Sequence, residues 1–373
     1  GIEEYSDILT IGLDKERIRA KLLKTRKTFF IEGWVPERCV SDVSAILDEN
    51  GCYYTFREPL EDEEVPVLME NRSMVVPFEA VTEMYSLPAY HGFDPTSIFA
   101  LFYAVFFGML LSDAGYGILM AVGCWAALKK FDLEGMTYKM VKLLFYCGIS
   151  TTVWGALFGG WFGDIVPVFT RTFLEKEVTV SPLWFNPLDD PMKLLILSLA
   201  LGVIHLFIGM GIKAYMQIRE GHWFDAVCDE GFWYVTILGL IAWLGGGTIN
   251  EALPQIGMYM SIVGAAGLLL TGGRHNKGFG KITGGLSNIY NITSYMSDIL
   301  SYARLLALGL ATGVIAQVVN TMGTLFGGGI TGLIALTVIF LFGHTLNLAI
   351  NALGAFIHAG RLQHVEFVRK FSE

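Results

Sequence analysis

Long apolar stretches dominate the chain from residue 97 onward. A helix needs about 20 apolar residues to cross the hydrocarbon core of a membrane. The last two stretches are unusually long, at about 50 and 57 Å of helix, so they must tilt or project beyond a core of about 30 Å. The eight candidate segments are 97–112, 115–129, 139–163, 191–217, 230–249, 254–272, 289–321 and 331–368.

The beginning of the chain has a different pattern. Residues 1–27 alternate charged and apolar positions at helical spacing, which predicts an exposed helix, either one strand of a coiled coil or a plain amphipathic surface helix. Residues 28–35 and 52–58 are rich in aromatic and β-branched residues and predict two strands, with a helix over 36–49 between them. This part is expected to form a small α+β piece.

The predicted fold is therefore mostly α. An eight-helix transmembrane domain over residues 96–373 ends in two long tilted helices, and residues 1–95 precede it. The chain begins at Gly1 in a charged stretch, without the pattern of a signal peptide. We expect it to be part of a longer protein.

Charge separates the same two regions. Residues 1–96 hold 10 Lys/Arg and 19 Asp/Glu, whereas residues 97–373 hold 16 of each, so the whole net charge of −9 belongs to the first region. Charged residues make up 16% of the chain and hydrophobic residues 53%, whereas soluble proteins carry roughly 25% charged residues. This composition argues against a soluble enzyme and against a basic nucleic-acid-binding protein.

The distribution of Lys and Arg predicts the topology. Cytoplasmic loops carry an excess of both residues. If the first two stretches form a hairpin broken at residues 112–117, the outer side receives only Arg171, Lys176 and Lys193, and the other loop cations fall on the cytoplasmic side. A single first helix would break this alternation. We therefore expect eight spans, with the N-terminal piece and both ends of the chain in the cytoplasm.

Common cofactor and metal motifs are missing from the sequence. Its five cysteines are widely spaced, which suggests neither a disulfide framework nor a zinc site. The glycine-rich residues 272–285 do not fit a phosphate-binding loop, because Ile282 follows Lys281 where Ser or Thr is required. We expect no cofactor, no bound metal and no catalytic site in this chain.

Arg304 lies near the centre of the seventh apolar stretch. A charge there costs about 2.5–3.5 kcal/mol on insertion scales, so it is a candidate functional residue. The acid in the same stretch, Asp298, is six residues away, about 240° around a helix, and does not face it. We favour a functional arginine over a structural one that pairs with a carboxylate.

Polar residues line one face of the seventh stretch at steps of four, three, four and three, and end beside Arg304. They suit half of an ion path, although they could instead be packing contacts between helices. They are Ser287, Asn291, Ser294, Asp298 and Ser301. Beyond Arg304 the helix is nearly all apolar, with Thr312 an exception.

A second stripe with the same steps follows the eighth stretch, and His344 extends it outward. It indicates a lined path or a protein contact, although Arg361 could simply reach the membrane surface. Its members are Asn347, Asn351, Gly354, His358 and Arg361.

Three further candidates lie elsewhere. Asp113 sits at the hairpin tip and Asp164 at the end of the third stretch, and either could be a simple surface acid. His205 lies in the middle of the fourth stretch, where a hydrogen-bonded packing role is as plausible as a functional one.

Four segments resemble a known family. They resemble the large membrane subunit of V-type rotary ATPases, called subunit a in eukaryotes and subunit I in bacteria and archaea. The resemblance covers essentially all 373 residues, which look like the C-terminal part of that subunit, and the short loops look like the prokaryotic form. The segments are FIEGWVP (30–36), FFGMLLSDAGYG (106–117), SYARLLALGLA (301–311) and HAGRLQHVEF (358–367).

The resemblance implies a rotary motor. In this family the subunit is a stator with two ion half-channels, and a ring of proteolipid c subunits rotates past its last two helices. Arg304 matches the arginine that attracts each ring carboxylate, and Arg361 matches a second arginine. Other partners would be the peripheral stalk and the cap of the central stalk, through the cytoplasmic arm, and the lipid bilayer, but no nucleic acid.

Other residues match the family's half-channels. Asp113 and Asp164 match acids of the outer one, Asp298 and Ser301 fall on the cytoplasmic side, and Glu366 belongs to the last motif. Departures also exist: Thr312 stands where the eukaryotic pattern has His, Asn351 stands where it has Glu, and Tyr290 lies near the position of another Glu. The relay and the ion, H⁺ or Na⁺, therefore stay open.

Two other classes of protein compete with this interpretation. A secondary ion transporter would show repeated halves with helices broken at the midplane, but the break at 112–117 has no counterpart in the second half. A purely structural anchor would leave Arg304 and both polar stripes unexplained. For the rotary subunit we expect a prokaryotic plasma membrane, or an endomembrane in a eukaryote.

Overall fold

The structure is a computed structural model that describes residues 2–24, 28–60, 63, 65–85, 87, 94–176, 178–248, 250–272, 280–327 and 329–372. Two compact units divide the chain. The first contains residues 1–70 and 89–91, and the second contains residues 71–88 and 92–373.

The first unit is small and only partly regular. It contains helix α1 (Ile2–Lys21), the 3₁₀ helix η1 (Glu37–Cys39) and helix α2 (Val40–Glu49). Two short antiparallel strands, β1 (Leu23–Lys24) and β2 (Phe29–Phe30), pair Leu23 with Phe30.

The β-α-β unit expected here is only partly present. The first predicted strand is limited to Phe29–Phe30, and residues 52–58 form no strand. Tyr53 in that segment is 96% exposed, so the aromatic side chains have no buried face that would hold a strand in register. The prediction of a strand over 52–58 was wrong.

Arg57 links distant parts of this unit. Its guanidinium donates to Glu63 at 2.6 and 2.7 Å and to Glu32 at 2.9 Å. The hydrogen bonds from Arg57 to Glu63, with help from the backbone N–H of Leu60, lower the pKa of Glu63 to about 2. The segment that follows α2 is thus connected electrostatically to the residues that precede it.

The second unit is helical. Each of the eight apolar stretches coincides with a helix or with consecutive helices, whereas the short helices α3, α7, α9 and α15 were not predicted. The helices are α3 (Val76–Tyr85), α4 (Thr96–Leu111), α5 (Ala114–Lys130), α6 (Gly135–Phe158), α7 (Ile165–Leu174), α8 (Pro191–Arg219), α9 (Trp223–Ala226), α10 (Phe232–Gly245), α11 (Leu253–Thr271), α12 (Gly280–Ser301), α13 (Ala303–Thr324), α14 (Ile330–Arg361) and α15 (Arg369–Ser372), with the 3₁₀ helix η3 (Gly246–Thr248) and the π-helices η2 (Val227–Gly231) and η4 (Leu362–Val368).

Five helical segments in the described part of the chain are long and apolar enough to cross a membrane. They are α6, α8, α11, the α12–α13 segment from Tyr290 to Thr324, and α14 with η4 from Ile330 to Val368. Helices α4, α5 and α10 are shorter, at 16, 17 and 14 residues. These helices support a multi-pass membrane protein, and the arrangement of eight spans stays a prediction.

The first two apolar stretches form two helices, as the Lys/Arg distribution predicted. Ser112 ends α4 in the left-handed region, with φ of 40°. The carboxylate of Asp113 then accepts a hydrogen bond from the backbone N–H of Tyr116 at 3.1 Å and caps α5. Such a cap satisfies an N–H group that has no partner within the helix.

The seventh stretch is not one continuous helix. The chain leaves α12 at Ser301 and enters α13 at Ala303, and the backbone bonds around Tyr302 span three residues rather than four. Packing explains the break: the buried Tyr302 ring lies against Gly202, where a β-carbon would be 2.6 Å from it. The eighth stretch also changes geometry, because α14 passes into the π-helix η4.

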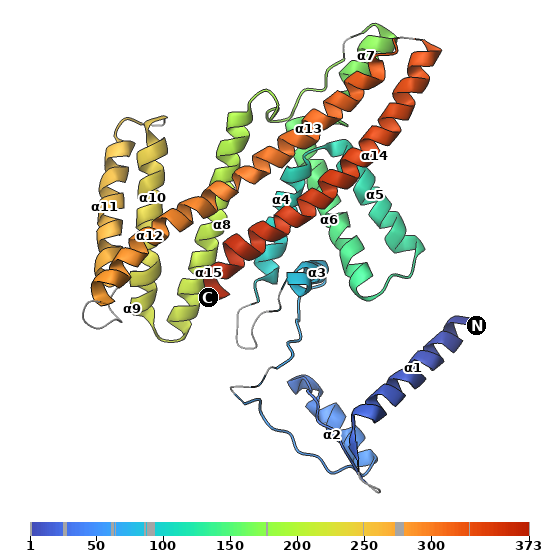
Figure 1. The fold of residues 1–373 in the computed structure, drawn as a ribbon, viewed down its shortest axis with the longest axis vertical. Coiled ribbons are helices and arrows are strands. Elements are labelled where there is room, and N and C mark those ends of the chain that lie inside the picture. Colours follow the sequence, from blue (N-terminus) through green and yellow to red (C-terminus); the bar gives the residue numbers. More distant parts are fainter. Residues whose placement is uncertain are drawn as a thin grey trace. The chain divides into compact units, whose positions relative to one another are not determined.

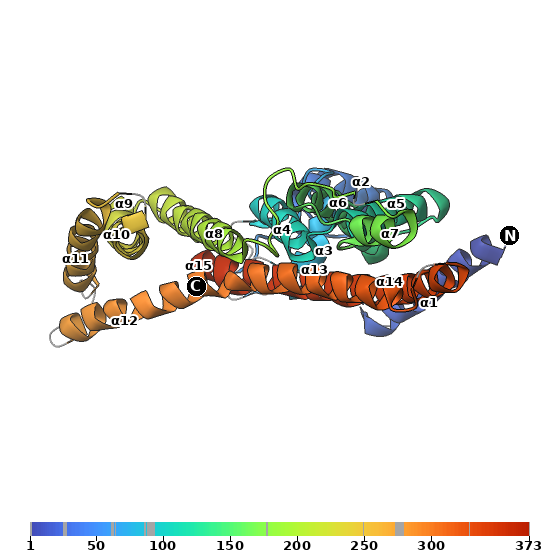
Figure 2. The same cartoon turned by 90° about the horizontal axis from the view of Figure 1, so that it is seen from above.

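Helices α12, α13 and α14 form one layer, and the helices from α4 to α8 lie on one side of it (Figure 2). Helices α10 and α11 make a hairpin beside α8 (Figure 1). Between α6 and the α13–α14 pair lies α4, whose aromatic residues are buried on all sides. A helix that is apolar all round is stable only when it is surrounded in this way.

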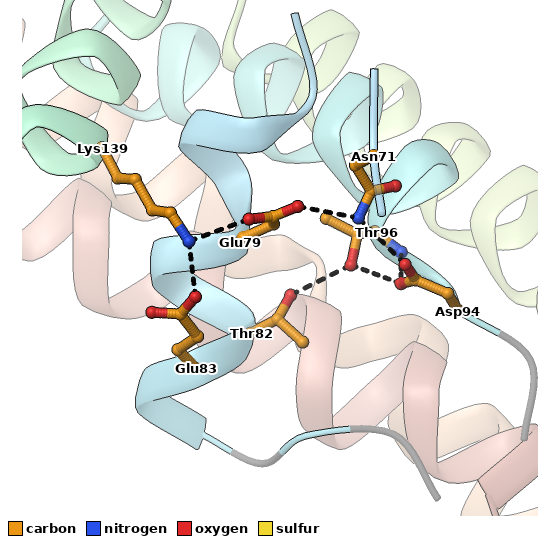
Figure 3. A network of polar contacts seen from close by, with 7 residues as sticks. All are labelled: Asn71, Glu79, Thr82, Glu83, Asp94, Thr96 and Lys139. Atoms are coloured by element: carbon orange, nitrogen blue, oxygen red, sulfur yellow. Dashed lines mark hydrogen bonds and ion pairs between the residues drawn. The ribbon is translucent and has the colours of Figure 1, made fainter. Parts of the chain in front are cut away.

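A polar network connects α3 to the beginning of α4 and to α6 (Figure 3). Glu79 on α3 is 5% exposed. Its carboxylate accepts from Lys139 of α6 at 2.8 Å and from Asn71 at 3.1 Å, and Asn71 also donates to Asp94. Asp94 in turn accepts from the backbone N–H of Thr96 at 2.9 Å. A buried carboxylate requires such partners.

Helices α5 and α6 pack backbone against backbone. A β-carbon at Gly117 would lie 2.4 Å from the backbone nitrogen of Thr152, and one at Gly155 would lie 2.0 Å from that of Ala114. Small residues allow this approach between membrane helices, where dispersion contacts drive association.

We therefore expect Gly155→Ala to lower the free energy of unfolding by about 1–3 kcal/mol, because the added methyl group pushes the two backbones apart. Thermal unfolding in detergent measures the change. Gly123→Ala in α5 is the control, since a β-carbon there meets nothing within 4 Å. Equal stability of the two variants would contradict this account of the packing.

Candidate functional site

Arg304 is the second residue of α13, directly after the break at Tyr302. Helices α13 and α14 pack along each other. The guanidinium lies close enough to Arg361 and His358 for their charges to interact. The structure therefore brings the central arginine of the seventh stretch to the inner end of the second polar stripe.

Arg304 is incompletely partnered. Its side chain is half-buried, and Nη1 is buried without a hydrogen-bond partner in the described part of the chain. A buried donor without an acceptor costs about 1–3 kcal/mol. The structure thus leaves this donor unsatisfied among the described residues.

Asp298 binds a different cation. It forms an ion pair with Lys370 of α15, and the two side chains are only 10% and 9% exposed. The amine of Lys370 also lies 3.9 Å from the centre of the Tyr295 ring. As the helical spacing indicated, Asp298 does not pair with Arg304.

Ser301 and Glu366 complete a polar cluster near this ion pair. The Ser301 hydroxyl donates to the backbone carbonyl of Asp298 at 2.7 Å. Glu366, buried on the π-helix η4, interacts with Asp298, Ser301 and Arg304. Three predicted site residues thus meet beside the arginine.

The rest of the first stripe becomes progressively more exposed toward the start of α12. Ser294 is half-buried, whereas Asn291 and Ser287 are exposed. The stripe therefore passes from the surface to the buried Asp298.

A cavity of about 380 Å³ lies at the other end of the α13 layer, next to the α4–α5 turn. Asp113 and Asp164 both line it, together with Gly309, Gly313 and Gln317 of α13. The structure thus brings the two acids to one hollow, although 50 residues separate them in the chain.

Asp113 is held tightly by the backbone. It is 2% exposed, and besides Tyr116 it accepts from the backbone N–H groups of Phe162 at 3.0 Å and Gly163 at 2.8 Å. These bonds fasten the α4–α5 turn to the segment between α6 and α7. The residue therefore shapes the cavity as well as lining it.

A chain of buried hydrogen bonds leads from Asp164 into the helix layer. Asn320 of α13 donates to Asp164 at 3.0 Å, and its carbonyl oxygen lies 2.9 Å from Nε2 of His344. Nδ1 of His344 lies 2.5 Å from the hydroxyl of Tyr116, which also accepts from Asn347 at 2.8 Å.

Asn351 and Thr312, which stand where the eukaryotic pattern has Glu and His, continue this chain of hydrogen bonds. Asn351 donates to the side-chain oxygen of Asn347 at 2.5 Å, and Asn347 donates to the backbone carbonyl of Thr312 at 3.2 Å. The outer half of the second stripe is thus hydrogen-bonded and buried, whereas His358 is half-buried and Arg361 is exposed.

His205 is packed into the break between α12 and α13. Its Nδ1 lies 2.7 Å from the hydroxyl of Tyr302, and its ring stacks on Phe367 of η4 at 4.3 Å. These contacts suit a packing role better than a role in a path.

Sequence reasoning missed several residues of the site. Asn320 could have been found, because Thr312, Ala316 and Asn320 step by four on the buried face of α13. Tyr116 and Lys370 gave no such signal, since their partners lie 228 and 72 residues away.

Comparison with known proteins identifies relatives along almost the whole chain. It is 34% identical over 404 residues to the A-type ATP synthase subunit I of Methanocaldococcus jannaschii, and 35% identical over 389 residues to that of Thermococcus kodakarensis. Each match covers 98% of this chain and 56% of the relative. The V-type ATP synthase subunit I of Borreliella burgdorferi is 26% identical over 383 residues, which cover 98% of this chain and 61% of the relative.

The chain belongs to the ATP synthase subunit I family. It spans about half the length of the curated relatives it matches. No protein-family model matches it. The apolar helices of this subunit I homologue support a multi-pass membrane protein.

The buried hydrogen-bond chain of this subunit I homologue makes a testable prediction. Tyr116→Phe removes the hydroxyl that contacts both His344 and Asn347. We expect the free energy of unfolding to fall by about 1–3 kcal/mol for each polar group left without a partner. Thermal unfolding in detergent measures the loss.

The matched control is Tyr259→Phe in α11, whose side chain is 65% exposed. This variant should unfold like the unmodified protein. If Tyr116→Phe were equally stable, the hydroxyl would not hold the network together.

Proposed function

We propose that this chain is the stator subunit of the membrane motor of a V/A-type ATPase. In this proposal it forms two ion half-channels against a rotating ring of proteolipid subunits. It couples translocation of an ion, H⁺ or Na⁺, to ATP hydrolysis or synthesis, and it carries out no ATP chemistry itself.

The incompletely partnered guanidinium of Arg304 is the observation that carries the proposal. Its Nη1 lacks an acceptor among the described residues, while the nearby Asp298 is occupied by Lys370. Because the side chain as a whole is only half-buried, a ring carboxylate that passes this point would bind the accessible part of the guanidinium. The arginine would favour the charged form of that carboxylate, because an opposite charge nearby stabilises ionisation.

The cavity supports an outer half-channel. It is lined by Asp113 and Asp164, and the hydrogen bonds through Asn320, His344 and Tyr116 lead inward from it. Inside a membrane, polar groups of this kind are costly and mark ion pathways.

The stripe along α12 supports a half-channel on the cytoplasmic side. It passes from exposed Ser287 and Asn291 to the buried cluster of Asp298, Ser301 and Glu366. In this proposal Arg304 separates the two half-channels, and His358 and Arg361 add positive charge around it.

The open face of the α13–α14 layer suits an apolar partner. Figure 2 shows the helices from α4 to α8 on one side of this layer. Along α14, Leu346, Ile350 and Leu353 are exposed at helical spacing. Such a stripe suits contact with the helices of a proteolipid ring and with lipid.

The acidic first unit suits an arm that binds the soluble parts of the complex. In this proposal it lies in the cytoplasm and contacts the peripheral stalk and the cap of the central stalk. The membrane would be a prokaryotic plasma membrane, as the archaeal and bacterial relatives suggest.

Replacement of Arg304 tests the proposal. In the assembled ATPase, reconstituted in vesicles, Arg304→Ala should lower ATP-driven ion uptake by about tenfold to hundredfold, since a charged hydrogen bond of about 1.5–3 kcal/mol is lost. ATP binding to the complex should persist.

Arg219→Ala is the control, because this cation is exposed at the end of α8. It should pump ions at the unmodified rate. Normal uptake in the Arg304→Ala complex would refute the stator role. Transport by the isolated chain without a ring would favour a secondary transporter instead.

A further inference from the structure

The ion pair between Lys370 and Asp298 brings together two distant parts of the chain. Lys370 lies on α15 and Asp298 on α12, and both side chains are nearly buried. The amine of Lys370 also packs over the Tyr295 ring, which contacts Trp233 at 4.2 Å. The position of this cation is thus set by two contacts with α12, and Trp233 packs against one of the contacting residues.

The ion pair balances the charge of the site. Two acids, Asp298 and Glu366, lie beside each other, and Glu366 also interacts with Arg304. Two cations, Lys370 and Arg304, compensate them. Lys370 takes up Asp298, and among the described residues the acid that interacts with Arg304 is Glu366, while Nη1 stays without an acceptor.

Removal of Lys370 would change this balance. Two buried carboxyl groups would then share one cation, Arg304. A buried charge without a partner is strongly unfavourable, so the guanidinium would be drawn toward Glu366, which interacts with Asp298 as well as with Arg304. A guanidinium that already donates to acids of its own chain is no longer available to bind a carboxylate of a second molecule.

We propose that Lys370 is a positioning residue for Arg304: by binding Asp298 it keeps that acid from competing for the guanidinium. The proposal rests on the proposed function, because it concerns how Arg304 stays available to the ring carboxylate.

A set of variants in the assembled, reconstituted ATPase tests this role. Lys370→Met removes the charge with little change in volume, and Lys370→Arg keeps the charge. The measurement is the number of ions moved per ATP hydrolysed, relative to the amount of assembled complex. If the ion pair were purely structural, Lys370→Met would lower the amount of assembled complex but would leave the number of ions moved per ATP unchanged.

We expect Lys370→Met to lower ions per ATP by about tenfold, the effect of losing one hydrogen bond to a charged group. Lys370→Arg should restore most of the coupling. Arg369→Met is the control, because the neighbouring cation is exposed, and it should behave like the unmodified protein.

A second pair of variants shows whether Lys370 acts through Asp298. When Asp298 is already replaced by Asn, the change Lys370→Met should cause less than about a twofold further loss, since partners in one interaction are not additive. An additional tenfold loss would contradict the proposal. So would normal ions per ATP in Lys370→Met, or a defect confined to the amount of complex.

Failure of this inference is distinguishable from failure of the proposed function. If Arg304→Ala pumps normally, the stator role itself is wrong. If Arg304→Ala is inactive while Lys370→Met keeps full coupling, the stator role stands and Lys370 has no part in it.

Discussion

A guanidinium set among apolar helices is the constraint on which the rest of the membrane unit depends. Arg304 is half-buried, and its Nη1 has no acceptor among the residues that the structure describes. The break at Tyr302 places it at the start of a new helix, and the contacts of Tyr302 with His205 and Gly202 hold that break. The helix geometry around the arginine is thus set by packing rather than by a Pro or Gly in the segment itself.

The polar groups on the two sides of Arg304 are organised differently. On one side, Asp164, Asn320, His344 and Tyr116 satisfy one another in a continuous buried chain. On the other side, Asp298 and Glu366 share a small cluster in which Lys370 pairs with Asp298 and Glu366 interacts with Arg304. Hydrogen bonds between neutral groups dominate the first region, whereas ion pairs dominate the second. Loss of one group therefore leaves an unsatisfied hydrogen-bonding group in the first region but an unpaired buried charge in the second.

The apolar runs were sufficient to predict the long helices of the second unit, because burial of a long apolar segment leaves the backbone few alternatives to a helix. The hairpin between α4 and α5 was also predictable, because the loop cations alternate only if the chain turns at Ser112 and Asp113. The stripe that leads to Asp298 follows from helical spacing alone.

The remaining features depend on partners far away in the chain. The break at Tyr302 arises from side chains about 100 residues earlier, and the ion pair of Asp298 arises from a lysine 72 residues later. Conversely, residues 52–58 have the composition of a strand but no strand to pair with. Local propensity decides little where tertiary contacts are absent or dominate.

The break at Tyr302 has a consequence for how this segment can evolve. Asp298 and Arg304 face different partners, and each inserted or deleted residue between them would rotate one relative to the other by about 100°. Substitutions of the intervening apolar residues change only local packing, whereas a change of length would misdirect the arginine and every residue after it. Homologous chains are therefore expected to keep the number of residues between these two positions, and to keep Tyr302, whose packing forms the break.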